Sequence, residues 1–255
     1  MTGGAAMAHG TDGTDGTDGT AAAAPLAIVT GVARRGQVGA VVARVLAERG
    51  AAVALLDRDA VECEARAAEL RQAGHQASAW PCDLTDHAAL SAVATQLAER
   101  HAHGAHALVV LAGGFGMLGP VAGSDPAAWD RMLTINLATA YATTRAFLPL
   151  VRRARGSLVY FASAAVVPGA HAAEMAAYGA AKAGVVTLMR AVAAEERPHG
   201  VRANALAPSA IRTDDNRAAM GDQASFVERE TVAEWVHFLT APASGPVSGQ
   251  LIALG

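Results

Sequence analysis

The amino-acid sequence predicts an α/β fold, a doubly wound parallel sheet of about seven strands with helices on both faces. Two observations lead to this prediction. From Pro25 onward, short apolar runs alternate with longer Ala-rich segments of helical periodicity, a pattern typical of β-α-β units. The chain has 255 residues, of which 52% are hydrophobic and 17% charged, so it can bury one sizeable core. We therefore expect a single domain over residues 25–255.

Seven short apolar runs are expected to form the strands of this sheet. They are Leu26–Thr30, Ala52–Asp57, Gln76–Pro81, His106–Leu111, Ser157–Ala162, Val201–Leu206 and Gln250–Leu254. A long helix is expected from Tyr178 to Glu196 and a shorter one from 229 to 242. The stretch from Thr213 to Arg229 has little periodicity and mixed charge, which indicates a loop with one short helix. Residues 1–24 carry three TDG repeats among Gly, Ala and Thr, a composition that predicts a disordered tail.

The charge and residue usage exclude several classes of protein. A net charge of -3 and a pI near 6.3 leave no basic surplus for nucleic acid or a membrane surface. No charge-free run of 18 apolar residues is present, and acidic repeats precede the first apolar run, the wrong charge order for export. We therefore expect a cytoplasmic protein. Cys63 and Cys82 form neither a disulfide framework nor a metal spacing, and His101, His103 and His106 lack a carboxylate or Cys to complete a cluster, so no metal site is expected.

A glycine-rich turn follows the first predicted strand directly. Gly31, Gly36 and Gly39 lead into a helix, and glycine permits tight turning and close backbone approach. A helix N-terminus also presents free N–H groups to a pyrophosphate. Asp57 ends the second strand, about where a carboxylate meets the adenosine ribose in a dinucleotide fold, although an Asp there could equally cap the next helix. Together the turn and the carboxylate indicate a dinucleotide site.

The predicted helix from Tyr178 to Glu196 carries a phenol and an ammonium one turn apart. Residues i and i+4 share a helix face, so Tyr178 and Lys182 are expected to lie side by side. A nearby cation favours the phenolate and is expected to lower the pKa of the phenol towards neutrality. This makes Tyr178 a candidate acid and base. An isolated Y-x-x-x-K is more often an incidental surface pair, so the interpretation depends on the motifs around it.

Further motifs occur in a fixed order before this helix. They are Asp83-Leu84 in PCDLTD, Ala112-Gly113 in LVVLAGG, Asn136 in INLATAY and Ser163 in GSLVYFASAAV. With the glycine-rich turn and the Tyr-Lys pair, they resemble the short-chain dehydrogenase/reductase family, whose fold is of the Rossmann type. The resemblance extends from about Leu26 to the end of the chain and implies an NAD(P)-dependent oxidoreductase acting on a small-molecule alcohol or ketone.

The resemblance also implies roles for individual residues. The catalytic residues would be Asn136, Ser163, Tyr178 and Lys182. The cofactor would be bound by Gly31, Arg35, Gly36, Val38, Gly39, Asp57, Arg58, Asp83, Leu84, Ala112, Gly113, Tyr178, Lys182, Pro208, Ala210, Ile211 and Thr213. In the family's chemistry Tyr178 moves a proton to or from the substrate oxygen, and Lys182 lowers the pKa of that Tyr and holds the nicotinamide ribose. Ser163 would hydrogen-bond the substrate oxygen and Asn136 would fix a water that links Lys182 to solvent.

Four features of the sequence depart from the family pattern. The second and third glycines are displaced to Gly36 and Gly39, which lengthens the turn. Leu111 stands where the family usually has Asn, so a strand-stabilising contact is expected to be missing. Ser163 lies fifteen residues before Tyr178, more than is common, and Ser209 replaces a usual Gly. None of these changes removes a catalytic group.

The cofactor and the substrate are less closely defined. Asp57 repels a 2′-phosphate and favours NAD, yet Arg34, Arg35 and Arg58 could attract one, so NADP stays possible. Candidate substrate-lining residues, which could equally be core, are Met117, Leu118, Val166, Val167, Ala210 and Met220. The short segment after Thr213 suggests an open site. The family also implies a homo-oligomer, a tetramer or a dimer, paired through the helix after Asp125 and the Tyr178 helix. The alternative from another class is a catalytically weak or inactive NAD-binding scaffold protein of the same fold.

Overall fold

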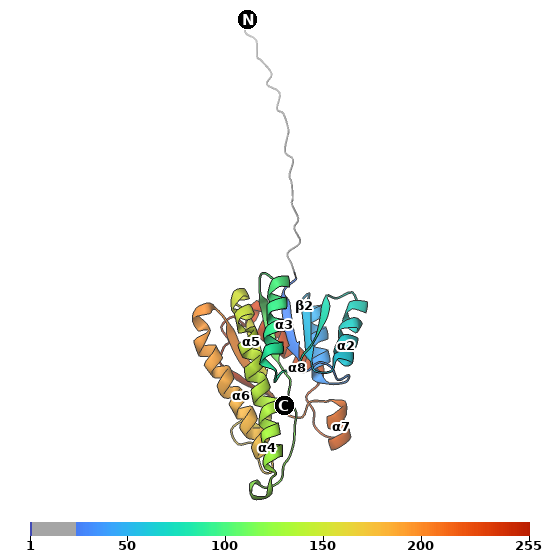
Figure 1. Cartoon of the computed structure of the whole chain (residues 1–255), viewed down its shortest axis with the longest axis vertical. Helices are drawn as coiled ribbons and strands as arrows, with labels where there is room; N and C mark the ends of the chain where they lie inside the picture. Colours follow the sequence, from blue (N-terminus) through green and yellow to red (C-terminus); the bar gives the residue numbers. More distant parts are fainter. Residues whose placement is uncertain (2–23) are drawn as a thin grey trace.

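A seven-stranded parallel sheet forms the centre of the computed structural model, which describes Met1 and residues 24–255 (Figure 1). The strand order is β3-β2-β1-β4-β5-β6-β7, and every neighbouring pair is parallel. The strands are β1 (Leu26–Thr30), β2 (Ala52–Asp57), β3 (Ala77–Pro81), β4 (Ala105–Val110), β5 (Ser157–Phe161), β6 (Arg202–Pro208) and β7 (Leu251–Leu254). The predicted fold and all seven predicted strands are confirmed, with ends that move by at most two residues. The predicted tail over residues 1–24 lies, apart from its two end residues, outside the described part of the chain.

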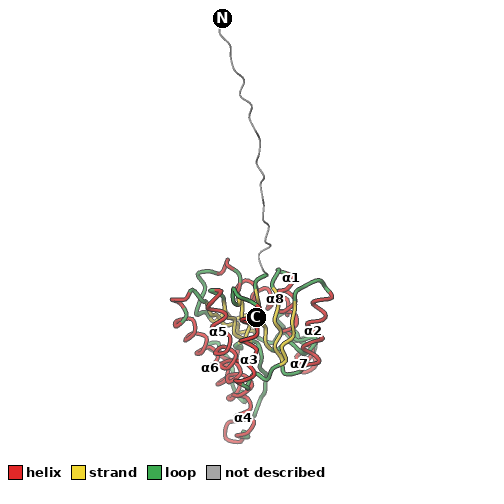
Figure 2. Tube along the Cα trace, turned by 45° about the horizontal axis from the view of Figure 1, so that its top comes forward, coloured by secondary structure: helices red, strands yellow, loops and turns green. Residues whose placement is uncertain are grey.

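Helices cover the sheet on both faces (Figure 2). They are α1 (Val38–Glu48), α2 (Ala60–Gln72), α3 (His87–Arg100), α4 (Pro126–Leu133), α5 (Thr139–Ala154), α6 (Ala176–Glu195), α7 (Asp214–Met220) and α8 (Arg229–Thr240). Helices α1, α2 and α8 pack on one face, and α3, α5 and α6 pack on the other. None of the helices in the described residues is long and apolar enough to cross a bilayer.

Alternation along each strand divides the core into two layers. Leu26 and Ile28 of β1 belong to the layer under α3, α5 and α6, whereas Ala27 and Val29 belong to the layer under α1, α2 and α8. All of β1 is buried, as expected for a strand covered on both faces. Both cysteines are buried and free.

Short polar side chains cap the N-termini of several helices. Asp59, Asp86 and Asp125 accept hydrogen bonds from backbone N–H groups in the first turns of α2, α3 and α4, respectively. Thr213 caps the short α7, which is the one helix predicted between Thr213 and Arg229. Because all strands run in the same direction, the turns that follow their carboxyl ends meet at one edge of the sheet, where the predicted site residues lie.

Candidate active site

Tyr178 and Lys182 lie on the same face of α6. The Lys182 Nζ is 5.8 Å from the centroid of the Tyr178 ring. The side chain of Lys182 is buried, and its Nζ donates a 2.8 Å hydrogen bond to the Phe161 carbonyl at the end of β5. Ser163 follows two residues later, and its hydroxyl lies close enough to the Tyr178 phenol to influence the pKa of that phenol. The predicted Ser, Tyr and Lys are therefore brought together by α6 and the end of β5.

The pKa of Tyr178 does not follow the expectation from the sequence. Burial raises the pKa of the phenol, because the phenolate would lose hydration, and a hydrogen bond from Ser163 partly opposes this rise. The expected lowering by Lys182 is absent. The ammonium lies over the ring and is bonded to the Phe161 carbonyl instead of the phenol oxygen.

Lys182 itself is perturbed by its surroundings. Burial lowers the pKa of its ammonium from 10.5 to about 8, because the charged form is the one that loses hydration. The sequence contains a further signal here that motif reading missed, since Lys182 is the only lysine in the chain, beside nineteen arginines. Arginine keeps its charge in proteins, whereas a buried lysine can lose its proton. The chain thus has its one side-chain ammonium at the site.

Asn136 lies in η2, the π-helical turn Thr134–Ala138 that joins α4 to α5. Its side chain is 1% exposed and exchanges two hydrogen bonds with Gly114, from the Gly114 N–H to Oδ1 at 3.1 Å and from Nδ2 to the Gly114 carbonyl at 3.0 Å. A Cβ placed on Gly113 would lie 2.5 Å from Asn136 Oδ1 and 3.3 Å from Lys182 Nζ. Asn136 therefore holds the glycine turn after β4 against Lys182.

The glycine-rich turn at the end of β1 has the conformation that its sequence requires. Gly31 and Gly36 have φ values of +72° and +75°, which favour glycine. A Cβ on Gly31 would lie 2.9 Å from the Ala112 Cα, and one on Gly39 would collide with the Gly31 carbonyl, so the turn packs backbone against backbone. Helix α1 begins at Val38, just after the turn. These features fit a nucleotide whose phosphates approach the backbone closely.

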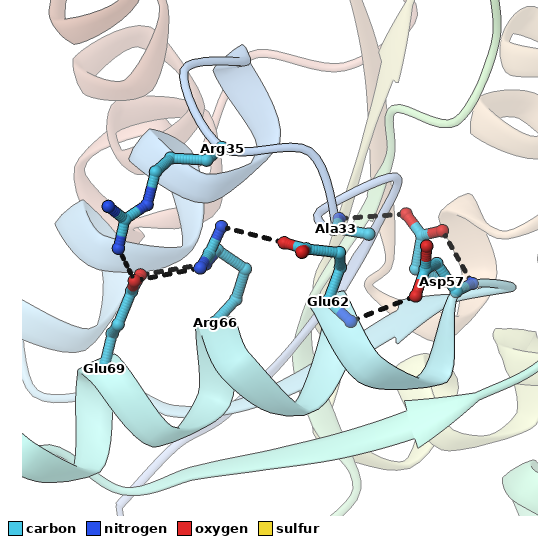
Figure 3. A network of polar contacts seen from close by, with 7 residues as sticks. Ala33, Arg35, Asp57, Glu62, Arg66 and Glu69 are labelled. Carbon is cyan, nitrogen blue, oxygen red and sulfur yellow. Dashed lines mark hydrogen bonds and ion pairs between the residues drawn. The ribbon is translucent and has the colours of Figure 1, made fainter.

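Asp57 joins the end of β2 to the glycine-rich turn (Figure 3). Its Oδ2 accepts a 3.0 Å hydrogen bond from the Ala33 N–H, and its Oδ1 accepts one from the Asp59 N–H at 3.3 Å. The alternative that Asp57 caps α2 is wrong, because Asp59 is the capping residue. A carboxylate has more acceptor positions than these two bonds use, so Asp57 can still accept hydroxyl groups.

The arginines near Asp57 differ in their partners. Arg34 forms an ion pair with Asp215 of α7, and Arg35 forms one with Glu69 of α2 (Figure 3). All four of these side chains are largely exposed, so the pairs can exchange partners at little cost. Arg58 is exposed. The pKa of Asp83 is lowered mainly by the two hydrogen bonds that its carboxylate accepts from Thr85, and to a smaller extent by the charge of Arg58.

The other predicted cofactor residues lie at the same edge of the sheet, but several have buried side chains. Val38 and Leu84 are packed in the two core layers, so only their backbone could face a ligand. Pro208 ends β6 and is buried, and Thr213 is buried at the start of α7. The half-buried residues are Ala112, Ala210 and Ile211.

Three contributions at this edge were not predicted from the sequence. The Thr30 hydroxyl donates to the Val109 carbonyl and accepts from the N–H groups of Leu111 and Ala112, which joins β1 to β4. Leu111 packs on the core, so a threonine hydroxyl connects these strands at the point where the family's Asn is missing.

Arg229 of α8 donates to the Gly36 carbonyl at 2.7 Å. Phe115 meets Tyr178 edge-on, with ring centroids 5.1 Å apart.

Comparison with known proteins agrees with this arrangement. A family model described as short chain dehydrogenase matches residues 25–224. The chain belongs to the short-chain dehydrogenase/reductase family. Members of this family are oxidoreductases that act on alcohols and ketones with nicotinamide cofactors, and the coarse prediction of such an enzyme is confirmed.

Individual members of the family are similar over most of their length. Cis-4-hydroxycyclohexanecarboxylate dehydrogenase of Sinomonas cyclohexanicum is 35% identical over 90% of this chain and 94% of its own. Galactitol 2-dehydrogenase of Rhizobium johnstonii is 32% identical over 89% of this chain and 91% of its own. The crystal structure of NAD+-bound xylitol dehydrogenase has a TM-score of 0.81 and 25% identity, and the match covers 90% of this chain and 97% of that one.

Proposed function

We propose that this short-chain dehydrogenase/reductase interconverts a small-molecule alcohol and its ketone with Tyr178 as the general acid and base. The observation that carries the proposal is the convergence of three groups. Tyr178 and Lys182 share one face of α6, and the Ser163 hydroxyl lies near the phenol. In alcohol oxidation the carbinol oxygen gives its proton to Tyr178, and in ketone reduction the proton returns.

The cofactor fits the turns at the carboxyl ends of the strands. Gly31, Gly36 and Gly39 permit the close packing of the turn that leads into the N-terminus of α1, where the phosphates would bind, and Asp57 offers acceptors for ribose hydroxyls. When bound, the nicotinamide ring would accept or donate the hydride. The remaining proposed cofactor contacts come from Arg35, Val38, Arg58, Asp83, Leu84, Ala112, Gly113, Pro208, Ala210, Ile211 and Thr213.

The groups around Tyr178 have distinct proposed roles. Ser163 hydrogen-bonds the substrate oxygen as its charge changes. Lys182, with a pKa of about 8, supplies a cation that can give up its proton near the working pH and that lies close enough to the turn at Gly113 to hold the nicotinamide ribose. Asn136 positions Gly113 and Gly114 through its two bonds to Gly114 and, in addition, fixes a water between Lys182 and solvent.

NAD is the proposed cofactor, with NADP as the alternative. Asp57 is oriented towards the turn that would hold the adenosine ribose, where its charge would repel a 2′-phosphate. Arg34 and Arg35 are engaged by Asp215 and Glu69, so a 2′-phosphate would have to compete with these carboxylates. Binding of NADH and NADPH, followed by fluorescence, tests the choice, and a strong preference for NADPH contradicts it.

A panel of alcohols and ketones assayed with NAD(H) and NADP(H) tests the function itself. Turnover of at least one pair is expected. Cofactor binding without any turnover would instead support the inactive scaffold.

We further propose a cytoplasmic homotetramer, with a dimer as the alternative, paired through the helix after Asp125 and through α6. Mass photometry of the purified protein tests its oligomeric state.

A further inference from the structure

Phe115 contacts the proposed catalytic Tyr178, yet most of its own side chain is exposed to solvent. Its side chain lies against the edge of the Tyr178 ring, with an interplanar angle of 82°. The residue is nevertheless 63% exposed, and an exposed aromatic ring beside a reacting group leaves a large apolar surface in water. A substrate held at Tyr178 would lie beside this ring.

The chain on both sides of Phe115 is anchored. Gly114 is held by the Asn136 side chain through two hydrogen bonds, and the Leu118 N–H donates a 2.9 Å bond to the Glu174 carbonyl. A Cβ on Gly116 would lie 2.5 Å from the Met132 Cε, so the backbone packs closely there as well. The ring is therefore held over Tyr178 by its backbone, before any ligand binds.

The surface around Phe115 is apolar and nearly uncharged. Residues 111–124 contain no charged side chain, and this segment exposes Phe115, Met117 and Val121. The segment from 162 to 178, which contacts it at Glu174 and Tyr178, contains no charged residue besides Glu174. A polyol would leave hydroxyl groups unpaired on this surface, and an anion would meet Glu174 with no Lys or Arg in either segment to compensate its charge.

We propose that Phe115 determines specificity and selects neutral alcohols and ketones whose carbinol or carbonyl carbon carries an alicyclic or aryl ring. The ring of the substrate packs on Phe115 while its oxygen reaches Tyr178 and Ser163. This inference rests on the proposed function and narrows its substrate class.

The test compares wild type with Phe115→Ala and Phe115→Leu on 1-phenylethanol, cyclohexanol, 2-propanol and galactitol. Wild type is expected to have higher kcat/KM for the two ring alcohols than for galactitol. Phe115→Ala is expected to lower kcat/KM for the ring alcohols about tenfold, which corresponds to about 1.4 kcal/mol of lost contact with the ring of the substrate. The kcat/KM of Phe115→Leu for the ring alcohols should lie between those of the wild type and Phe115→Ala. The kcat/KM for 2-propanol should change less than about twofold, because 2-propanol has no ring to contact Phe115.

Phe238→Ala is the matched control, because Phe238 on α8 is also exposed and also meets an aromatic ring, Trp235, edge-on. It should leave all four rates unchanged.

Two results would overturn the inference while leaving the proposed function intact. One is a preference of the wild type for galactitol over both ring alcohols. The other is an equal loss for all substrates in Phe115→Ala, which would make Phe115 a support for Tyr178 and not a selector. If no alcohol or ketone is turned over at all, the proposed function fails together with the inference.

Discussion

At the nucleotide end of the site, charged side chains lie exposed and paired with one another, as in Arg34 with Asp215 and Arg35 with Glu69. At the Tyr178 end, the charged group is the buried Lys182, and its partner is a backbone carbonyl. Exposed pairs are screened and worth little, whereas a buried charge is costly to place and costly to leave unsatisfied. Substitutions at the two ends should therefore differ in the size of their effects.

The largest effect is expected for Tyr178→Phe. General acid–base catalysis contributes about 10²–10⁴-fold, so kcat should fall by at least 10²-fold in both directions. NADH binding should persist, because the hydroxyl alone is removed. Stopped-flow or steady-state kinetics and NADH fluorescence measure the two quantities. Tyr141→Phe, which alters a half-exposed phenol on α5, is the control and should keep full activity. Activity retained in Tyr178→Phe would remove this residue from the mechanism.

Lys182→Met should lower kcat by about 10²-fold and should also change how stability depends on pH. The pKa of Lys182 is lowered on folding, so between about pH 8 and pH 10.5 the unfolded state binds more protons, and this group's contribution to the free energy of unfolding rises with pH. The difference in unfolding free energy between wild type and Lys182→Met should shift in favour of the wild type across that window. Urea denaturation at several pH values measures it.

The single lysine allows the same point to be checked without a mutation. Selective labelling with isotopic lysine gives one side-chain signal, because the chain contains no other lysine. Its NMR titration should report a pKa of about 8. A value near 10.5 would mean that the ammonium is hydrated, and the contrast between the two ends of the site would disappear.

Asp57→Ala is expected to have an intermediate effect. It removes the acceptor proposed for the ribose and the bond to the Ala33 N–H, and a hydrogen bond to a charged group is worth about 1.5–3 kcal/mol. NADH affinity should fall at least tenfold, while the ratio of NADPH to NADH affinity should rise because the repelling charge is gone. Isothermal titration with both cofactors measures this. Unchanged NADH affinity would place the ribose elsewhere.

The smallest effect is expected for Arg35→Ala. Its pair with Glu69 is exposed, and Glu69 keeps Arg66, so the unfolding free energy should change by less than about 1 kcal/mol. NADH affinity should fall by no more than about twofold, because a contact between the cofactor and a cation as exposed as Arg35 is screened by solvent. A large loss of NADPH affinity with NADH unchanged would show that Arg35 leaves Glu69 for a 2′-phosphate. Arg44→Ala is the control, because it removes the exposed ion pair between Arg44 and Glu48 within α1.

Much of the fold could be predicted from the sequence because local patterns and the fold agree. Buried strands such as β1 are uniformly apolar, and the short polar residues that follow β2 and β3 cap the next helices. The shared face of Tyr178 and Lys182 follows from helical spacing alone. These features depend on residues close together in the sequence.

The features that could not be predicted depend on distant contacts. The pKa of Tyr178 is governed by burial, which spacing does not reveal, so the expected effect of Lys182 was wrong. In the sequence Phe115 cannot be distinguished from other apolar residues, because its contact with Tyr178 joins residues 63 positions apart. The π-helical turn at Asn136 was likewise not predicted, and the partner of the Asn136 side chain, Gly114, lies 22 positions earlier in the sequence.

The hydrogen bond from Arg229 to the Gly36 carbonyl spans 193 positions. During synthesis, the glycine-rich turn emerges long before the guanidinium that bonds it. The turn proposed to hold the phosphates therefore gains this contact only when nearly the whole polypeptide has been made.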